Sequence, residues 1–243
     1  ALAAAPRGKL EANCYLGMGS AHGELGQFDK AVRAYEKVVE LRPRDPEAYH
    51  ALAIGQEDAG DLRGARASLT QALALNPDQL AAYQDLASLY LKDKDLEGAK
   101  KVYLQYELRR TYLIKTLGMA KKAEDRAAAA AALGQARDEA TAKALGLALT
   151  DRSREVRIEV IKALGRQALA EGAGPLRAHL RRSKDDQERR LTQIALKAIA
   201  AAPQPGPQSA PAVGADDAPP ASRPASGRGA VRPQPGDTPP SSR

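Results

Sequence analysis

EAYHALAIGQEDAGDLRGARASLTQALALNP, residues 47–77, contains the pattern that decides the fold. Its apolar residues recur at helical spacing in two runs, and Gly60 stands between the runs. Glycine adopts a positive φ without steric cost and often ends a helix, whereas Pro77 cannot continue one. The stretch therefore predicts a helix over 47–59, a tight turn, and a second helix over 62–74.

The same pattern occurs once before this stretch and once after it, with a period of 34 residues. The positions that recur are Tyr15, Tyr49 and Tyr83; Ala31, Ala65 and Ala99; and Tyr35, Leu69 and Tyr103. A fixed period over three units indicates an array of helical repeats. The outer units predict helices over 11–24, 29–41, 79–91 and 96–117. The last helix is extended because Thr111 stands where the period predicts proline.

The order of residue types within each unit resembles the tetratricopeptide repeat. That family has a large residue, a Leu-Gly step, a Tyr, then an Ala, an aromatic residue and a Pro. The first unit supplies Tyr15, Met18-Gly19, His22, Ala31, Tyr35 and Pro43. The resemblance covers residues 11–110, although His22, Gln56 and Leu69 depart from the pattern. It implies a solenoid of helix pairs whose first helices line a concave groove for a partner protein.

A second periodicity, of arginine residues, follows the three units. Arg126, Arg157 and Arg189 are spaced 31 and 32 residues apart, and each is followed by Ala-Leu six and seven residues later. This pattern resembles HEAT repeats, which are also helix pairs stacked into solenoids. The resemblance covers residues 121–200, and the third copy lacks a second helix. It implies that Arg157 and Arg189 bridge neighbouring repeats.

These patterns divide the chain into four parts and predict an all-α fold, an α-solenoid. Residues 1–10 are expected to end a truncated preceding repeat, because Ala1-Leu2 and Pro6 match the closing register of a second helix. A tetratricopeptide domain of three repeats with an extended capping helix is predicted over 11–119, and a HEAT-like domain over 120–201. Residues 202–243 hold most of the prolines, among Ala, Ser and Arg, and predict a disordered tail.

The composition of the 243-residue chain argues against several classes of protein. Its one cysteine, Cys14, permits neither an internal disulfide nor a cysteine-only metal site. The sequence has no run of about 18 apolar residues, the length that spans a membrane. Only three histidines occur, and no acidic pair or metal-binding spacing stands out. We therefore expect no catalytic residue, no cofactor and no metal ion.

The partner-binding groove is predicted on the first helix of each tetratricopeptide unit, at positions outside the core pattern. These positions are Asn13, Leu16 and Ser20; Glu47, His50, Ile54 and Glu57; and Gln84, Ser88 and Leu91. Their mixture of apolar and polar side chains suits an extended peptide or a partner helix. The alternative interpretation is that they are ordinary solvated positions.

The net charge of +7 is concentrated in the HEAT-like part, where residues 121–200 carry 17 basic and 11 acidic residues. The densest basic cluster comprises Arg177, Arg181, Arg182, Lys184 and Arg190. Such a cluster fits contacts with phosphate groups or with an acidic partner. However, Asp185, Asp186 and Glu188 interrupt it, and no aromatic residue is available to stack on bases.

The sequence therefore predicts a non-catalytic scaffold that binds a partner peptide or helix in the groove. A nucleic-acid-associated protein that uses the basic segment is the alternative, and an enzyme module would need catalytic residues upstream of Ala1. We expect the native N-terminus to lie upstream of Ala1, and the cytoplasm is the favoured compartment. The Ala-, Arg- and Gly-rich usage suggests a bacterial source. The oligomeric state is left open.

Overall fold

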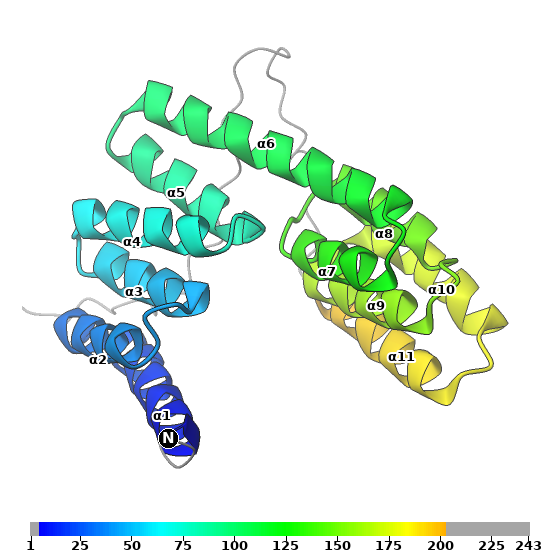
Figure 1. Cartoon of the computed structure of the whole chain (residues 1–243), viewed down its shortest axis with the longest axis horizontal. Helices are drawn as coiled ribbons and strands as arrows, with labels where there is room; N and C mark the ends of the chain where they lie inside the picture. Colours follow the sequence, from blue (N-terminus) through cyan, green and yellow to red (C-terminus); the bar gives the residue numbers. More distant parts are fainter. Residues whose placement is uncertain (1–4, 203–243) are drawn as a thin grey trace, which may run out of the picture.

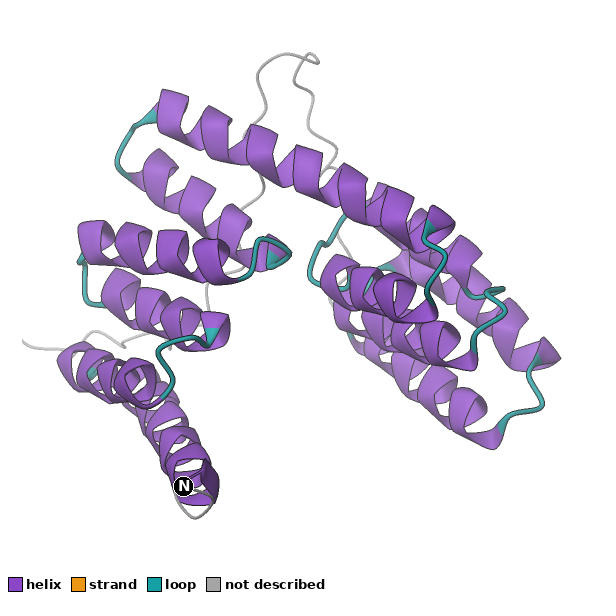
Figure 2. Cartoon of the chain, in the orientation of Figure 1, coloured by secondary structure: helices purple, strands orange, loops and turns teal. Residues whose placement is uncertain are grey.

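The computed structural model describes residues 5–202, which form only helices and connecting loops. The helices are α1 (Ala5–Glu24), α2 (Phe28–Leu41), α3 (Pro46–Asp58), α4 (Leu62–Leu75), α5 (Leu80–Lys92), α6 (Leu96–Met119), α7 (Ala123–Leu133), α8 (Glu139–Ala148), α9 (Arg154–Gln167), the 3-10 helix η1 (Ala170–Gly172), α10 (Ala173–Arg182) and α11 (Asp186–Ala201). Figures 1 and 2 show a first stack, α1–α6, and a second stack, α7–α11. The predicted all-α fold is confirmed.

The paired helices of the first stack end and begin where the sequence supplies turn residues. Gly26 and Gly60 have φ values of 69° and 84°, a region that favours glycine. The carboxylates of Asp61 and Asp95 accept hydrogen bonds from backbone N–H groups in the first turns of α4 and α6, at 2.9 and 2.8 Å. These residues set the length of each helix pair.

Close packing of the first three helices depends on two glycines. The ring of Tyr35 in α2 lies against Gly19 in α1 with one edge and against Gly55 in α3 with the other. A Cβ atom at Gly19 would lie 2.5 Å from the ring, and one at Gly55 would lie 2.8 Å from it. A methyl group therefore does not fit at either position unless Tyr35 moves.

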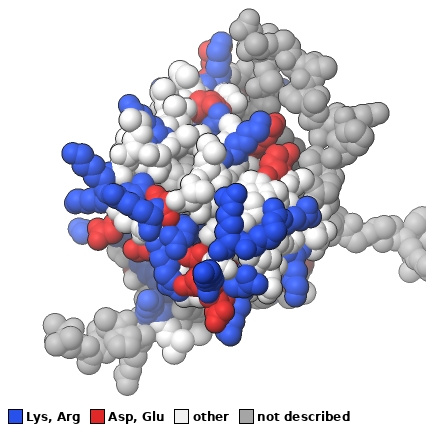
Figure 3. Space-filling model, turned by 90° about the vertical axis from the view of Figure 1, so that its right-hand side faces the viewer, with Lys and Arg blue, Asp and Glu red and all other residues white. Residues whose placement is uncertain are grey.

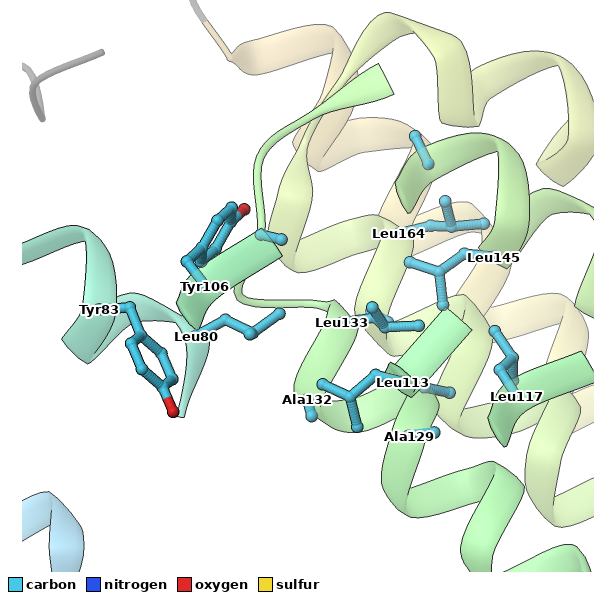
Figure 4. Packing of buried hydrophobic residues seen from close by; sticks show 14 of the residues in the cluster. Leu80, Tyr83, Tyr106, Leu113, Leu117, Ala129, Ala132, Leu133, Leu145 and Leu164 are labelled. Atoms are coloured by element: carbon cyan, nitrogen blue, oxygen red, sulfur yellow. The ribbon is translucent and has the colours of Figure 1, made fainter. Parts of the chain in front are cut away.

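The long helix α6 belongs to both stacks. Its C-terminal half contributes the buried Leu113 to the apolar cluster that contains Leu80 of α5 and Leu133 of α7 (Figure 4). The backbone N–H of Ala81 also donates to the side-chain oxygen of Gln135 across the junction, at 3.3 Å. One apolar core therefore continues from the first stack into the second.

Periodic arginines join neighbouring repeats in the second stack. Arg126 in α7 donates two hydrogen bonds to Asp151, at 2.7 and 2.9 Å. Arg157 in α9 donates two to Glu188 in α11, at 3.1 and 2.7 Å. Arg157 therefore bridges repeats as the HEAT resemblance implies, and Arg126 does so as well. Arg189 donates to backbone carbonyls instead, and no described acidic residue pairs with it.

Two positions on the outer face of α11 are polar where the preceding repeat is apolar, although Ile194 on the same face is 63 % exposed. At a spacing of 32 residues, Ile158 and Ile161 of α9 correspond to Arg190 and Gln193 of α11. The two isoleucines are buried, whereas Arg190 and Gln193 are exposed.

The first helix begins earlier than the predicted start at residue 11, while the assignment of residues 1–10 to a preceding repeat stays a prediction. The sequence predicts the end of an earlier helix near Pro6, but α1 begins at Ala5 and continues without interruption to Glu24. Proline is compatible with the first turn of a helix, because the N–H that it lacks would have no partner there. Residues 1–4 lie outside the described part, as does all of the predicted tail except Ala202.

Candidate protein-binding groove and basic face

The predicted groove residues lie on α1, α3 and α5, the first helices of the three repeats. Asn13, Ser20 and Glu47 are exposed. The half-buried residues are Leu16, Ile54, Glu57, Gln84, Ser88 and Leu91. Half-buried side chains have fixed stems and an accessible surface, so they can contact a partner with little loss of side-chain entropy.

Three of the polar groove residues bind other side chains of the chain. Asn13 accepts a hydrogen bond from Arg42 at 2.8 Å, and Gln84 donates to the Tyr106 hydroxyl at 3.4 Å. Glu57 forms an ion pair with Lys92. These contacts orient the three side chains before any partner arrives.

His50 differs from the other predicted groove residues. Its side chain is 9 % exposed, and its Nε2 lies 2.6 Å from a carboxylate oxygen of Asp85. Its Nδ1 lies 3.2 Å from Nε2 of Gln79. The ring of His50 therefore joins α3 to α5 and offers little surface, and its place in the partner-binding groove stays a prediction.

The predicted basic residues are exposed on α10, on α11 and in the loop between them. They are Arg177, Arg181, Arg182, Lys184 and Arg190, and none of them forms an ion pair with another described residue. Two of the acidic residues that interrupt the cluster are engaged elsewhere, Asp185 with Arg154 and Glu188 with Arg157. Figure 3 shows Lys and Arg side chains distributed over this side of the molecule, with acidic ones among them.

A hollow of about 450 Å³ adjoins the basic cluster and is lined by Arg182, Lys184 and Glu188 among others. Burial alone would raise the pKa of the Glu188 carboxyl, but hydrogen bonds from Arg157 and Ser183 outweigh it and lower that pKa. Glu188 is therefore ionised at neutral pH, with its charge matched by these donors. Arg182 and Lys184 are left to attract an anion.

The described residues contain no group of His, Cys, Asp and Glu side chains arranged to hold a metal ion. His22 binds the side chain of Gln27 at 2.9 Å, and Cys14 is exposed on the same helix. Within residues 5–202, none of the helices has the length and apolar character needed to cross a membrane.

The prediction from sequence missed one surface, on α6. Leu104, Leu108 and Tyr112 are exposed there, on the side of the helix away from the core. A comparison at the 34-residue period could have predicted this surface, because the matching positions of the other units carry polar or small residues.

Three family models match the chain. One describes TPR repeats and matches residues 19–54, and another describes tetratricopeptide repeats and matches residues 57–110. The third describes HEAT repeats and matches residues 112–197. This third match begins inside α6, in the half of the helix that packs against the second stack.

The chain is also similar to solved structures of other proteins. MamA from Desulfovibrio magneticus, residues 41 to the end, is 18 % identical with a TM-score of 0.34, over 78 % of this chain and 93 % of that chain. PilF from Pseudomonas aeruginosa is 16 % identical with a TM-score of 0.38, over 79 % and 89 %. The myosin chaperone UNC-45 from C. elegans, in complex with an Hsp90 peptide, is 17 % identical with a TM-score of 0.34, over 82 % and 25 %. A search of curated proteins gave no match.

Proposed function

Since the chain carries tetratricopeptide repeats followed by HEAT repeats, we propose that it is a scaffold that binds a segment of a partner protein along α1, α3 and α5. Repeat families of these two kinds are typically non-catalytic, and their stacked helices provide extended binding surfaces. The proposed role is recognition without a chemical step.

One observation carries this proposal: each of the three helices offers a half-buried aliphatic side chain with a polar neighbour one turn away. The pairs are Leu16 with Ser20, Ile54 with Glu57, and Leu91 with Ser88. Apolar anchors supply affinity, and adjacent polar groups orient the bound segment. An extended peptide or a helix with one anchor per repeat would fit this arrangement.

The rigidity of the first stack supports the same proposal. Tyr35 fills the space that Gly19 and Gly55 leave, and the His50–Asp85 contact joins α3 to α5. A surface that is already ordered loses little conformational entropy when a partner binds. The partner segment would then bear most of the ordering cost.

The test is affinity capture from host cells with three baits: the unaltered chain, a groove variant and a matched control. The groove variant carries Ile54→Glu and Leu91→Glu, and the control carries Thr70→Glu and Ala74→Glu on the exposed side of α4. A protein that the control retains and the groove variant loses, with both baits folded, supports the proposal. A protein that all three baits retain equally contradicts the assigned surface.

A second candidate function, binding of nucleic acid or another phosphate-bearing partner, is supported by the five basic side chains that have no described ion-pair partner. The hollow beside Arg182 and Lys184 gives such a partner a recessed contact. Treating the captured material with nuclease distinguishes this candidate from the first. If nuclease abolishes the enrichment and the groove variant enriches the same material as the unaltered chain, the second candidate function is favoured.

A further inference from the structure

The side of α6 that faces away from the core carries a stripe of exposed apolar residues. Leu104 is 60 % exposed, Leu108 is 65 % exposed and Tyr112 is 54 % exposed. They are four residues apart, so they lie one turn above another on one side of the helix. Val102 and Tyr106 are buried on the opposite side. The stripe is therefore not part of the core formed by residues 5–202.

The 34-residue period allows the same surface position to be compared in three second helices. The residues at the positions of Leu104 and Leu108 are Glu36 and Glu40 in α2, and Thr70 and Ala74 in α4. All six residues are exposed. Stacking of the repeats therefore does not require an apolar residue at either position. The two leucines in α6 indicate that something outside the described part of the chain covers this side of the helix.

Positive charge borders the stripe at both ends. Lys101 and Lys115 are exposed on the same side of α6 as the leucines, and neither forms an ion pair with a described residue. Glu107, beside the stripe, pairs with Arg110, whereas the exposed Glu97 lies one turn before Lys101 on the same side of α6. A partner that covers the stripe therefore meets a lysine at each end, and no acidic residue of α6 lies beside the one at Lys115.

We propose that this stripe and its two lysines, together called the α6 outer face, dock an amphipathic helix of a partner protein whose apolar side is bordered by acidic residues. Lys101 and Lys115 are separated by about 21 Å along the helix axis, at 1.5 Å per residue. Acidic residues about four turns apart on the partner helix would meet both lysines while its apolar side covers the stripe.

Two other occupants fit this face less well. Antiparallel pairing with the α6 of a second copy, centred on Leu108, would bring each Lys101 opposite a Lys115, and like charges repel. Residues 203–243 contain only Val213 and Val231 as branched aliphatic residues, too few for an apolar stripe. The surface also lies on a second helix of the repeat, so it is distinct from the groove on α1, α3 and α5.

The test measures binding of the full 243-residue chain to two fluorescent synthetic helical peptides by anisotropy. Both peptides are about 20 residues long with one leucine stripe; one has glutamates at the two ends of the stripe, and the other has lysines there. The chain variants are Leu104→Ser with Leu108→Ser, and Lys101→Glu with Lys115→Glu. Ala74→Ser in α4 is the matched control. Circular dichroism checks that every variant is folded.

We expect the chain to bind the acidic peptide at least about tenfold tighter than the basic one. Leu104→Ser with Leu108→Ser should weaken the affinity for the acidic peptide by at least about tenfold. Ala74→Ser should leave the affinity unchanged. Lys101→Glu with Lys115→Glu should make the chain prefer the basic peptide. Equal binding of both peptides, no binding of the acidic one, or binding that survives the serines would overturn the proposal. The proposal would also be overturned if the chain bound phosphatidylserine vesicles and not the acidic peptide, and if Leu104→Ser with Leu108→Ser abolished the binding to vesicles.

Discussion

Arg157 in α9 donates two hydrogen bonds to a single carboxylate oxygen of Glu188 in α11, from Nε at 3.1 Å and from Nη2 at 2.7 Å. The other oxygen accepts a hydrogen bond from Ser183 at 3.0 Å and lies 2.9 Å from Nε2 of His179. Glu188 is buried, so these contacts offset the loss of its hydration. One carboxylate therefore holds α9, α10 and α11 together.

Replacing this carboxylate should destabilise the protein. We expect Glu188→Gln to lower the free energy of unfolding by about 1–3 kcal/mol, because the amide cannot serve all the donors around it. Equilibrium unfolding in urea at neutral pH measures the change. Asp186→Asn, at an exposed position on the same helix, is the control and should cost less than about 1 kcal/mol.

The stability of the unaltered chain relative to Glu188→Gln should depend on pH in a defined direction. Folding lowers the pKa of Glu188, so its ionised form adds stability above the ordinary value of about 4.5 and loses it as the pH falls through the folded-state pKa. The stability difference between the unaltered chain and Glu188→Gln should shrink as the pH falls below about 4.5. A difference that persists unchanged into strong acid would contradict this account.

Replacing Gly55, which lies beside Tyr35, with alanine should destabilise the protein, whereas the same change at an ordinary helical glycine stabilises it. Alanine normally stabilises a helix interior relative to glycine by about 1 kcal/mol. At Gly55 the added methyl would lie 2.8 Å from the Tyr35 ring, so we expect Gly55→Ala to destabilise by about 1–3 kcal/mol. Gly17→Ala is the matched control, because no atom lies within 4 Å of its added methyl. Thermal unfolding that shifts upward for both variants would show that Tyr35 is not confined.

A core that continues through α6 should couple the two stacks. We expect Leu117→Ala to cost about 2–5 kcal/mol, because the side chain is buried and leaves a cavity. Hydrogen exchange followed along the chain should show that amides of α5 and α9 lose protection together. Loss of protection confined to α7–α11 would mean that the stacks unfold separately.

The basic cluster gives a prediction for the second candidate function. A chain that contacts phosphates should bind duplex DNA at least about tenfold more weakly at 200 mM salt than at 50 mM. Changing Arg177, Arg181, Arg182 and Lys184 to Gln should reduce the salt dependence by about 0.9 in log–log slope for each contact that is lost. Binding with an unchanged slope would show that these four side chains do not contact the phosphates.

The period made most of the helices predictable, because Gly26, Gly60 and the prolines mark where each pair turns and stops. The observed ends of α2 to α6 differ from the predicted ones by no more than two residues. The first helix begins at Ala5, six residues before its predicted start, since proline is compatible both with the region after a helix and with a first turn. The division into domains at 11–119 and 120–201 stays a prediction, and the continuous core shows that α6 packs in both parts.

The candidate site was less predictable than the fold. Periodicity tells which side of a helix a residue occupies, but it does not reveal a bond to another repeat. His50 was placed on the groove for that reason, although Asp85, one repeat later, engages its ring. The exposed leucines of α6 were missed because apolar residues on a repeat helix are usually assigned to the core.

The polar residues on the outer face of α11 also bear on how copies of the chain meet one another. A stack that ended in an apolar face could accept the free end of another stack, and such head-to-tail contacts do not close, so they extend into filaments. Arg190 and Gln193 stand where α9 has Ile158 and Ile161, and they keep that end hydrated. Two polar side chains beside the exposed Ile194 thus reduce the apolar surface that such a head-to-tail contact could use at this end of the described stack.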